Sequence, residues 1–471
     1  MSLIIWLILG SSVLAPSQEP TCGKKGIRAS VDPRVELMSI IFRLAGNPEY
    51  NQPNSKSPYA DEVEAHFGKF RGHAVVETAQ RLRARRGVSY DAVMSMAVHL
   101  EDTVSLREKI PFDKAPPRLD ERWRLEEARE FLGKARRFVK ETGFNEFVQT
   151  HAELYEAAGA RMTEKLGERA YLDWFDSFFG ARPKARFYVI VGMLNGGCCY
   201  GSGIRHLDGR EEITPVLGVW EFDDQGIPVI DDSIVPTVVH ELCHSYTNAL
   251  VDKHADELEP AGTRIFAHCA EVMKQQAYGN WKTMMYESLV RVCVVRYLRA
   301  SDGAAAARKE IREQHNRGFK WTGALSKLLA EYESNRERYR TFDAFMPKIV
   351  EFFNEHAGEY EELAARAPKV VAMTPANGAT DVDPSLTEIR ITFDRPMMDR
   401  CWAVVGGGPH FPEITGEVSY DKQCTVLTIP VRLKPDWSYE FWLNRGKYDS
   451  FQSQEGVRLE SVAVTFQTRG Q

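Results

Sequence analysis

The spacing of apolar residues predicts a helix-rich region over the first third of the chain. Asp32 and Pro33 are residue types of an N-cap and a first helical position, and an apolar helix follows them as far as Gly46. Helical spacing, with Ala, Glu, Lys and Arg between the apolar positions, continues over 59–70, 74–86, 90–100 and 119–166. We therefore expect a helical region over residues 30–180.

The pattern changes near residue 185. Segments 185–194 (ARFYVIVGML) and 213–222 (ITPVLGVWEF) are rich in β-branched and aromatic residues, which favours two strands. Gly196 and Gly197 follow the first strand and predict a loop or a bulged edge, because the GK[ST] and GxGxxG patterns of phosphate-binding loops are missing there. Helical spacing returns from residue 233 to about 365. The pattern predicts an α+β fold with a small sheet over residues 181–366.

The last hundred residues have a third texture. Turns containing Pro375, Gly378 and Pro384 separate short alternating runs at 388–393, 424–430 and 439–443, which predicts an all-β sandwich over 368–471. The segment PKVVAMTPANGATDVDPSLTEIRITFDRPM resembles the bacterial Ig-like domain of surface-layer proteins. The resemblance implies a spacer or surface-association module rather than a catalyst. The sequence leaves open whether Cys401 and Cys424 form a disulfide.

Composition narrows the class of protein. A chain of 471 residues exceeds what one hydrophobic core serves, and 43% hydrophobic with 27% charged residues is typical of folded globular domains. The net charge of -6, without a basic stripe interleaved with aromatics, argues against nucleic-acid binding. Eight cysteines without a CxxC pair exclude a disulfide scaffold and a zinc ribbon.

The N-terminus resembles a signal peptide over residues 1–15. An apolar run from Leu3 to Leu9 precedes small residues and a cleavage position at Ala15. A basic stretch before the run is missing, so an internal apolar strand is the alternative. The run is too short to span a bilayer, and we expect no transmembrane segment elsewhere. The expected location is outside the cytoplasm, either secreted, periplasmic or at the cell surface.

The segment TVVHELCHSY carries the candidate chemistry. His240 and His244 are one helical turn apart and project from the same face, so both imidazoles can bind one zinc ion. A catalytic zinc needs three protein ligands and one position open for water. Glu241 would act as general base toward that water when it attacks a peptide carbonyl. The alternative is a surface helix with two ordinary histidines.

The third ligand must come from a later element, because the HExxHxxGxxH spacing is missing. Glu271 and Glu287 compete for this role. Glu287 is preferred, since its helix is otherwise apolar and a carboxylate there needs a charged partner, which zinc would provide. Arg291, one turn later, would hold Glu287 in place. The alternative is a Glu287–Arg291 helix pair without metal.

Two resemblances extend this hypothesis. HELCH with a downstream glutamate resembles the glutamate-ligand zincins of the thermolysin-like class, which implies that strand 185–194, with Asn195, Gly196 and Gly197, pairs as an edge strand with an extended substrate. The combination of VDPRVELMSIIFRLAG, the glycine-rich Tyr-Gly segment, HExxH and E-x-x-x-R resembles a bacterial family of exported HExxH proteins of unknown function. Because the function of that family is unknown, this second resemblance supports the predicted domain architecture but does not indicate a substrate.

A hydrolase also needs a donor for the oxyanion, and Tyr286, His268 and Tyr200 are candidates that are equally well explained as core residues. The leading hypothesis is a secreted zinc-dependent peptide hydrolase with a peptide or protein substrate. One alternative is a zincin-fold surface or adhesion protein without turnover that binds through its Ig-like domain. Another is a structural surface protein with incidental histidines.

Overall fold

The computed structural model describes residues 27–52, 56–167, 171–445 and 448–470. The predicted signal peptide lies outside the described residues. The chain divides into two compact units, Met1–Val235 and Pro236–Gln471. Among the described residues, no helix combines the length and the apolar character that crossing a membrane requires.

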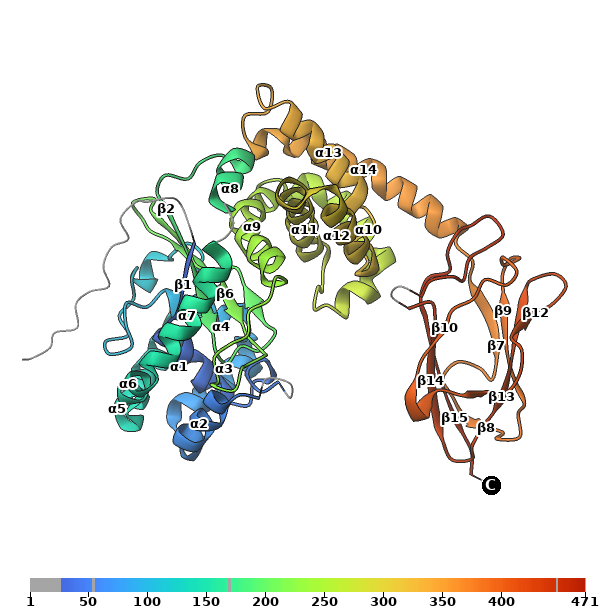
Figure 1. Cartoon of the computed structure of the whole chain (residues 1–471), viewed down its shortest axis with the longest axis horizontal. Helices are drawn as coiled ribbons and strands as arrows, with labels where there is room; N and C mark the ends of the chain where they lie inside the picture. The colour runs from blue at the N-terminus through green and yellow to red at the C-terminus, as the bar shows by residue number, and fades with distance from the viewer. Residues whose placement is uncertain (1–26, 53–55, 168–170, 446–447, 471) are drawn as a thin grey trace, which may run out of the picture. The chain divides into compact units, whose positions relative to one another are not determined.

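The first unit is rich in helices, as expected. They are α1 (Pro33–Leu44), η1 (Pro48–Tyr50), α2 (Pro58–Phe67), η2 (Gly68–Phe70), α3 (Ala74–Arg86), α4 (Asp91–Val98), η3 (Phe112–Lys114), α5 (Leu125–Thr142), α6 (Phe144–Thr150), α7 (Ala152–Gly167) and α8 (Tyr171–Phe179) (Figure 1). The predicted N-cap is confirmed, because the Asp32 side chain accepts a hydrogen bond from the Arg34 amide. The continuous helix expected over 119–166 is three helices. Gly143, at φ 65°, ends α5 in the left-handed conformation that glycine adopts easily.

The sheet of the first unit has an interior strand where the sequence predicted an edge. Its strands are β1 (Arg28–Val31), β2 (Ala185–Gly192), β3 (Cys199–Tyr200), β4 (Gly203–Arg205), β5 (Glu211–Ile213) and β6 (Val216–Gly218). Strands β5 and β6 lie end to end along β2, with Ala185 opposite Glu211 and Gly192 opposite Gly218. Strand β1 pairs in parallel with β2 at residues 188–191, on the side that β6 leaves free. The prediction that strand 185–194 is an edge was therefore wrong.

The turn after β2 is also committed to internal contacts. The Asn195 side-chain oxygen accepts a hydrogen bond from the Ser39 hydroxyl, and the Asn195 main-chain carbonyl accepts one from the Cys198 amide. Gly196 has a φ of 54°, and the Gly197 amide donates to Gln52. These groups join β2 to β3 in a tight turn, so Asn195 and Gly197 do not offer the free backbone that pairing with a substrate strand requires. Strands β3 and β4 follow one another along the chain and lie at the edge of this sheet, where β3 pairs with β6 and β4 pairs with β5.

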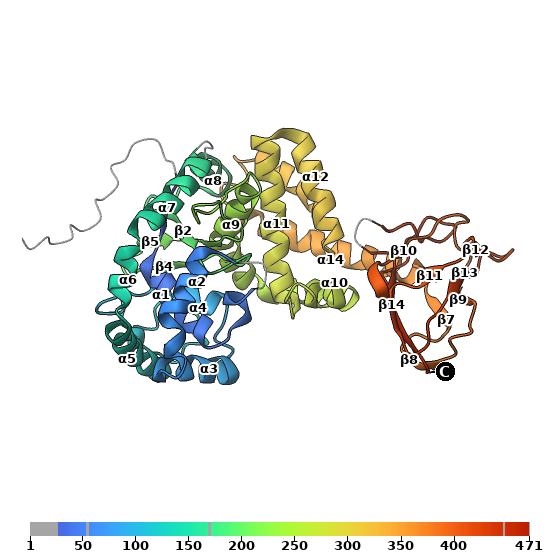
Figure 2. The same cartoon turned by 60° about the horizontal axis from the view of Figure 1, so that its bottom comes forward.

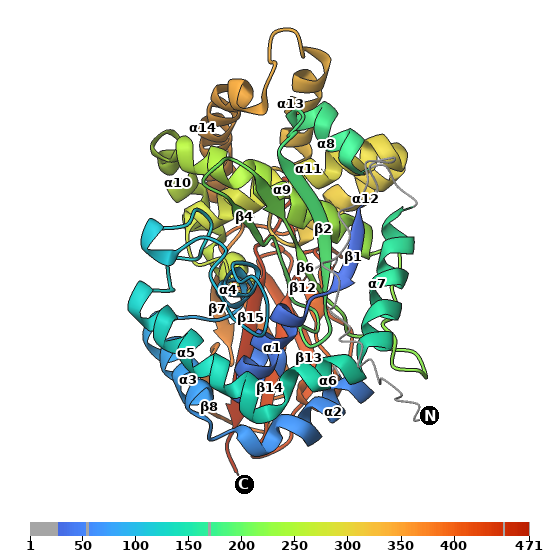
Figure 3. The same ribbon diagram turned by 90° about the vertical axis from the view of Figure 1, so that its left-hand side faces the viewer.

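Helix α7 covers the outer edge of β1 (Figure 3). The Ala29 amide donates to the Thr163 hydroxyl at 2.8 Å. Gly159 allows the close approach, because a Cβ atom there would lie 3.0 Å from the Ala29 carbonyl oxygen. The helices of the first 180 residues and the sheet therefore share one unit, and the predicted boundary at residue 180 falls inside it. Only four residues form β1, too few for a clear sequence signal.

The helices of the second unit carry the candidate site. They are α9 (Ile234–Lys253), which begins at the boundary between the units, α10 (Ala255–Lys274), α11 (Trp281–Ser301), α12 (Gly303–Asn316), α13 (Thr322–Ser334) and α14 (Phe342–Arg366). Helices α11 and α12 lie side by side (Figure 2). From Glu287 to Leu298 every residue of α11 is buried, and most of these residues are apolar.

The C-terminal region is a two-sheet sandwich. Its strands are β7 (Val370–Thr374), β8 (Ala379–Val382), β9 (Glu388–Phe393), β10 (Val404–Val405), β11 (Glu413–Ile414), β12 (Ser419–Tyr420), β13 (Val426–Arg432), β14 (Ser438–Leu443) and β15 (Val462–Thr468), with the 3-10 helix η4 (Gly408–His410). One sheet has the order β10-β14-β15-β8, and the other contains β11-β13-β9-β7. Alternate residues such as Ile389, Ile391 and Phe393 form the core. Cys401 and Cys424 are free thiols.

Candidate metal centre

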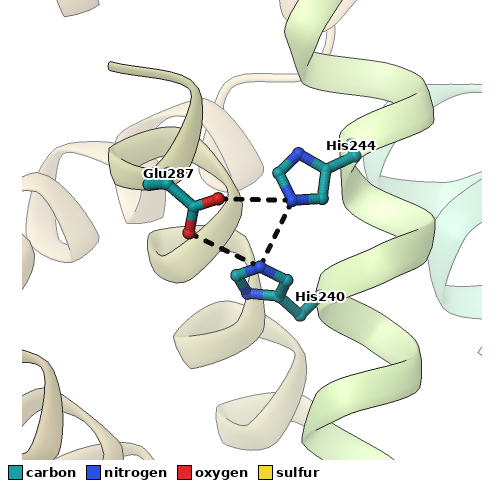
Figure 4. A group of neighbouring side chains, drawn as sticks. All are labelled: His240, His244 and Glu287. Atoms are coloured by element: carbon teal, nitrogen blue, oxygen red, sulfur yellow. Dashed lines mark hydrogen bonds and ion pairs between the residues drawn. The ribbon is translucent and has the colours of Figure 1, made fainter. Parts of the chain in front are cut away.

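Three side chains from two helices converge in the second unit. Helix α9 carries His240 and His244, and α11 carries Glu287. The two imidazole Nε2 atoms are 3.3 Å apart. His240 Nε2 lies 3.5 Å from Glu287 Oε2, and His244 Nε2 lies 3.5 Å from Glu287 Oε1. Figure 4 shows the carboxylate facing both rings. Within the described ranges, no other group of three or more His, Cys, Asp or Glu brings its ligand atoms together in this way.

The separations fit a zinc ion. In a tetrahedral site with ligand distances of about 2.0–2.1 Å, neighbouring ligand atoms lie about 3.3–3.4 Å from each other. The observed separations of 3.3, 3.5 and 3.5 Å are close to this value. Two imidazole nitrogens and one carboxylate oxygen form a donor set that zinc accepts at catalytic sites, with the fourth corner left for water.

The orientation of His244 and the charge state of His240 both suit metal ligands. The Nδ1 atom of His244 lies 3.1 Å from the Asn248 side-chain oxygen, so a proton on Nδ1 leaves Nε2 with a free lone pair toward Glu287. Burial lowers the pKa of His240 to about 3, despite the opposing attraction of Glu287. His240 is therefore uncharged at neutral pH, which is the form that binds metal.

Glu287 is held as a carboxylate although only 7% of it is exposed. Burial by itself would raise its pKa, but His240, His244, Arg291 and the Tyr278 hydroxyl lower the pKa of this carboxyl below its usual value. The Arg291 guanidinium lies 3.0 Å from Glu287 Oε2, and the Tyr278 hydroxyl donates to the same oxygen at 3.1 Å. The carboxylate is thus ionised and fixed in orientation by Arg291 and Tyr278.

Arg291 is itself anchored. It is 4% exposed, and it donates to Gln314 at 2.7 Å and to the Tyr278 hydroxyl at 2.7 Å. Its guanidinium lies 4.6 Å from the centre of the Phe319 ring, a favourable cation–π arrangement. These contacts hold Arg291 beside Glu287, where the sequence predicted it. Tyr278 and Gln314 were not predicted, because neither stands in a motif and only the packing of α12 and the loop after α10 brings them here.

Glu241 lies between the two histidines in sequence and is 7% exposed. Burial raises its pKa to about 7; the charge of Glu287 contributes in the same direction, while His244 opposes the shift. A carboxyl with a pKa near neutrality can both accept and return a proton under ordinary conditions. Its neighbours Val238, Val239 and Leu242 are fully buried, as expected for a helix beneath a site.

The remaining sequence candidates lie elsewhere. Glu271 is exposed on α10 and is not in the cluster. The Tyr286 hydroxyl donates to Asp252 at 2.5 Å, and His268 is exposed on α10. Tyr200 is buried in β3 of the first unit. None of the three is thereby identified as an oxyanion donor.

Comparison with protein families identifies both parts of the chain. Residues 27–352 match the family described as "Domain of unknown function (DUF4932)", which is more than half of the chain. The chain belongs to this family. Residues 364–468 match the family described as "Bacterial Ig-like domain", which confirms the predicted C-terminal Ig-like module. The DUF4932 region includes residues 27–235 of the first unit and the helices that carry His240, His244 and Glu287.

Other comparisons add little. No curated protein matches the chain. Among solved structures, the chain is similar to the S-layer protein rSbsC(31-844) at 16% identity, with 53% of this chain and 35% of that chain covered and a TM-score of 0.17. Domains 1-6 of the surface layer protein SbsC give 18% identity, 49% and 33% coverage and a TM-score of 0.17. The N-terminal part of SbsC gives 16% identity, 50% and 58% coverage and the same TM-score. The chain thus spans about a third of the first two structures.

Proposed function

We propose that this member of the DUF4932 family is a zinc-dependent peptide hydrolase whose metal is held by His240, His244 and Glu287. The observation that carries the proposal is the triangle of ligand atoms at 3.3, 3.5 and 3.5 Å, formed by a neutral imidazole, a second imidazole oriented by Asn248 and an ionised carboxylate. A metal ion would add to the stabilisation of this buried carboxylate, which Arg291 and Tyr278 otherwise provide alone.

The roles of the residues follow from their surroundings. When bound, zinc would polarise a peptide carbonyl and make a water molecule more acidic. Glu241 accepts a proton from the attacking water and passes it to the leaving amine, for which its pKa of about 7 is suited. Arg291 and Tyr278 keep the Glu287 carboxylate turned toward the histidines. Asn248 does the same for the His244 ring.

The location and partners form part of the same proposal. The apolar run at Leu3–Leu9 supports export, and the Ig-like module supports association with a cell surface. The substrate class is peptide or protein, on the resemblance of HELCH with a downstream glutamate to the glutamate-ligand zincins. The competing function is a zinc-binding surface protein without turnover, which the buried base Glu241 disfavours, since a site that only binds metal needs no such group.

Metal content tests the ligand set. The purified full chain is expected to hold about one zinc ion, measured by elemental analysis after dialysis, and His244→Ala is expected to hold almost none. His254→Ala is the matched control. That histidine pairs with Glu257 and Asp343 and lies outside the cluster, so its zinc content should equal that of wild type. Full zinc in His244→Ala would refute the assignment.

Turnover is tested separately. Glu241→Gln keeps the size of the side chain and removes the base, so zinc content should be unchanged while cleavage of an unfolded protein substrate falls by about a thousandfold or more. Cleavage at the wild-type rate would exclude Glu241 as the base. Wild type that holds zinc but cleaves no peptide would favour the surface protein without turnover.

A further inference from the structure

A cluster of arginines lies at the β4–β5 hairpin of the first unit. The carboxylate of Glu211, on β5, receives one guanidinium at each oxygen. Arg205 Nε is 2.7 Å from Oε1, and Arg182 Nη1 is 3.4 Å from Oε2. Arg205 stands opposite Glu211 in the ladder, so both side chains emerge on the same face of the sheet. Both oxygens of this carboxylate are therefore engaged.

A third guanidinium, that of Arg118, completes the cluster. It lies against β4 at Gly203, where a Cβ atom would be 3.1 Å from Nη1, so the glycine leaves room for the arginine. Gly203 and Arg205 are two residues apart on one strand and share its face. Among the described residues no side chain or carbonyl accepts a hydrogen bond from the Arg118 guanidinium, although Arg182 and Arg205 are close enough for their charges to act on it.

Arg118 is held in this position at a cost. Its φ of 74° is in the left-handed region, which is unfavourable for an arginine, and the Ser95 hydroxyl on α4 fixes the segment by donating to its carbonyl at 3.1 Å. Burial lowers the pKa of Arg118 to about 10, and the charges of Arg182 and Arg205 add to this against the attraction of Glu211. The group remains a cation at neutral pH.

The neighbouring acid cannot neutralise Arg118. Glu212 lies on the opposite face of β5, where it accepts from Lys109 at 2.7 Å and faces His206 at 2.8 Å. Three guanidiniums therefore lie around one carboxylate, whose two oxygens are already engaged by Arg205 and Arg182. The cluster is open to solvent at its rim, since the side chains of Arg205 and Arg182 are 45% and 24% exposed.

We propose that Arg118, Arg182 and Arg205 form a binding site for a phosphate group, independent of the metal centre. A tetrahedral phosphate group brings acceptor oxygens in several directions, whereas a planar carboxylate would bring two oxygens in one plane. Guanidinium groups bind phosphate through pairs of charge-assisted hydrogen bonds. The phosphate group would give Arg118 the acceptor that its described surroundings lack.

Calorimetric titration of the full chain with inorganic phosphate, at constant ionic strength, tests the site. We expect saturable binding of about one phosphate per chain with a Kd of about 1 mM or lower. Arg118→Gln should weaken binding about tenfold or more, since a charge-assisted hydrogen bond is lost. Arg210→Gln is the matched control. This arginine is on the same hairpin and pairs with Asp208, so its removal should leave the Kd within about twofold.

Further variants keep the test decisive. If Arg118→Gln does not fold, Arg205→Gln removes a guanidinium at the exposed rim and should also weaken binding. His244→Ala should bind phosphate as wild type does, which separates this site from any phosphate bound at the metal centre. Titration with glycerol phosphate distinguishes a site for free phosphate from a site for a phosphate monoester. Binding as tight as that of inorganic phosphate, or tighter, means that the site accepts a phosphate group carried by a larger molecule. Absence of saturable binding, or unchanged binding by both arginine variants, would overturn the proposal.

Discussion

Two glutamates lie buried on apolar helices in different units of the molecule, and their surroundings give them opposite character. Glu36 on α1 is fully buried, and its carboxyl accepts hydrogen bonds from the Met193 amide at 3.0 Å and from the Tyr59 hydroxyl at 2.9 Å. Burial raises the pKa of Glu36 to about 7, more than these two donors lower it. Glu287 on α11 is equally enclosed, yet its pKa lies below the usual value.

The difference lies in the partners rather than in burial. Glu36 has neutral donors only, so it can be buried most cheaply as a neutral acid. Glu287 faces Arg291 and the Tyr278 hydroxyl, which favour the charged form. A buried carboxylate beside two histidines can serve a metal, whereas one beside a tyrosine and an amide serves packing. An acid on an apolar helix therefore does not by itself define a site.

The largest expected effect is a difference in zinc affinity between variants of these two acids. Glu287→Gln should lower zinc affinity by on the order of a thousandfold, because a neutral amide oxygen replaces an anionic ligand. Glu36→Gln, the same change in the other unit, should leave zinc affinity as in wild type. Competition with a chromophoric chelator measures both. Equal losses in the two variants would mean that Glu287 affects zinc only through the stability of the fold.

The second effect concerns the pH dependence of stability. Burial raises the pKa of Glu36 from its ordinary value of 4.5 to about 7, so between these pH values the folded state binds a proton that the unfolded state has released. Stability from this group is complete below about pH 4.5 and is lost as the pH rises to about 7, a change of about 3 kcal/mol. Glu36→Gln keeps both hydrogen-bond positions filled, since its amide can donate to Tyr59 and its oxygen can accept from Met193.

Urea denaturation of wild type and Glu36→Gln at about pH 5 and about pH 8 measures this effect. The difference between the two proteins cancels the contribution of other titrating groups. We expect the variant to be more stable than wild type at the higher pH and nearly equal to it at the lower pH. A variant that is less stable at both pH values would show that Glu36 is ionised in the folded protein.

The smallest expected effect tests the fixation of Glu287. Tyr278→Phe removes a hydroxyl that donates to Glu287 and accepts from Arg291, so zinc affinity should fall about tenfold, as is common for groups that orient a ligand. Tyr286→Phe is the matched control, because its hydroxyl donates to Asp252 instead. Unchanged affinity in Tyr278→Phe would assign the orientation of Glu287 to Arg291 alone.

Much of the local structure was predictable. The helix of HELCH, the apolar helix of Glu287 and the strand at 388–393 were expected from periodicity, because side-chain spacing of 3.6 or 2 residues is written directly in the sequence. The interior position of β2 was not predictable, since it depends on β1, a strand of four residues whose partners on β2 lie 160 positions later in the sequence. Short parallel strands carry little local signal.

His240 and His244 share a helical face whatever the rest of the fold, because one turn of helix fixes that spacing. Glu287 and Glu36 are both acids in apolar helices, and nothing in the local sequence separates them. Long-range packing places one acid beside the histidines and the other beside a tyrosine. The physical reason is that the charge state of a buried group depends on the partners that packing brings within a few ångströms, and those partners come from distant parts of the chain.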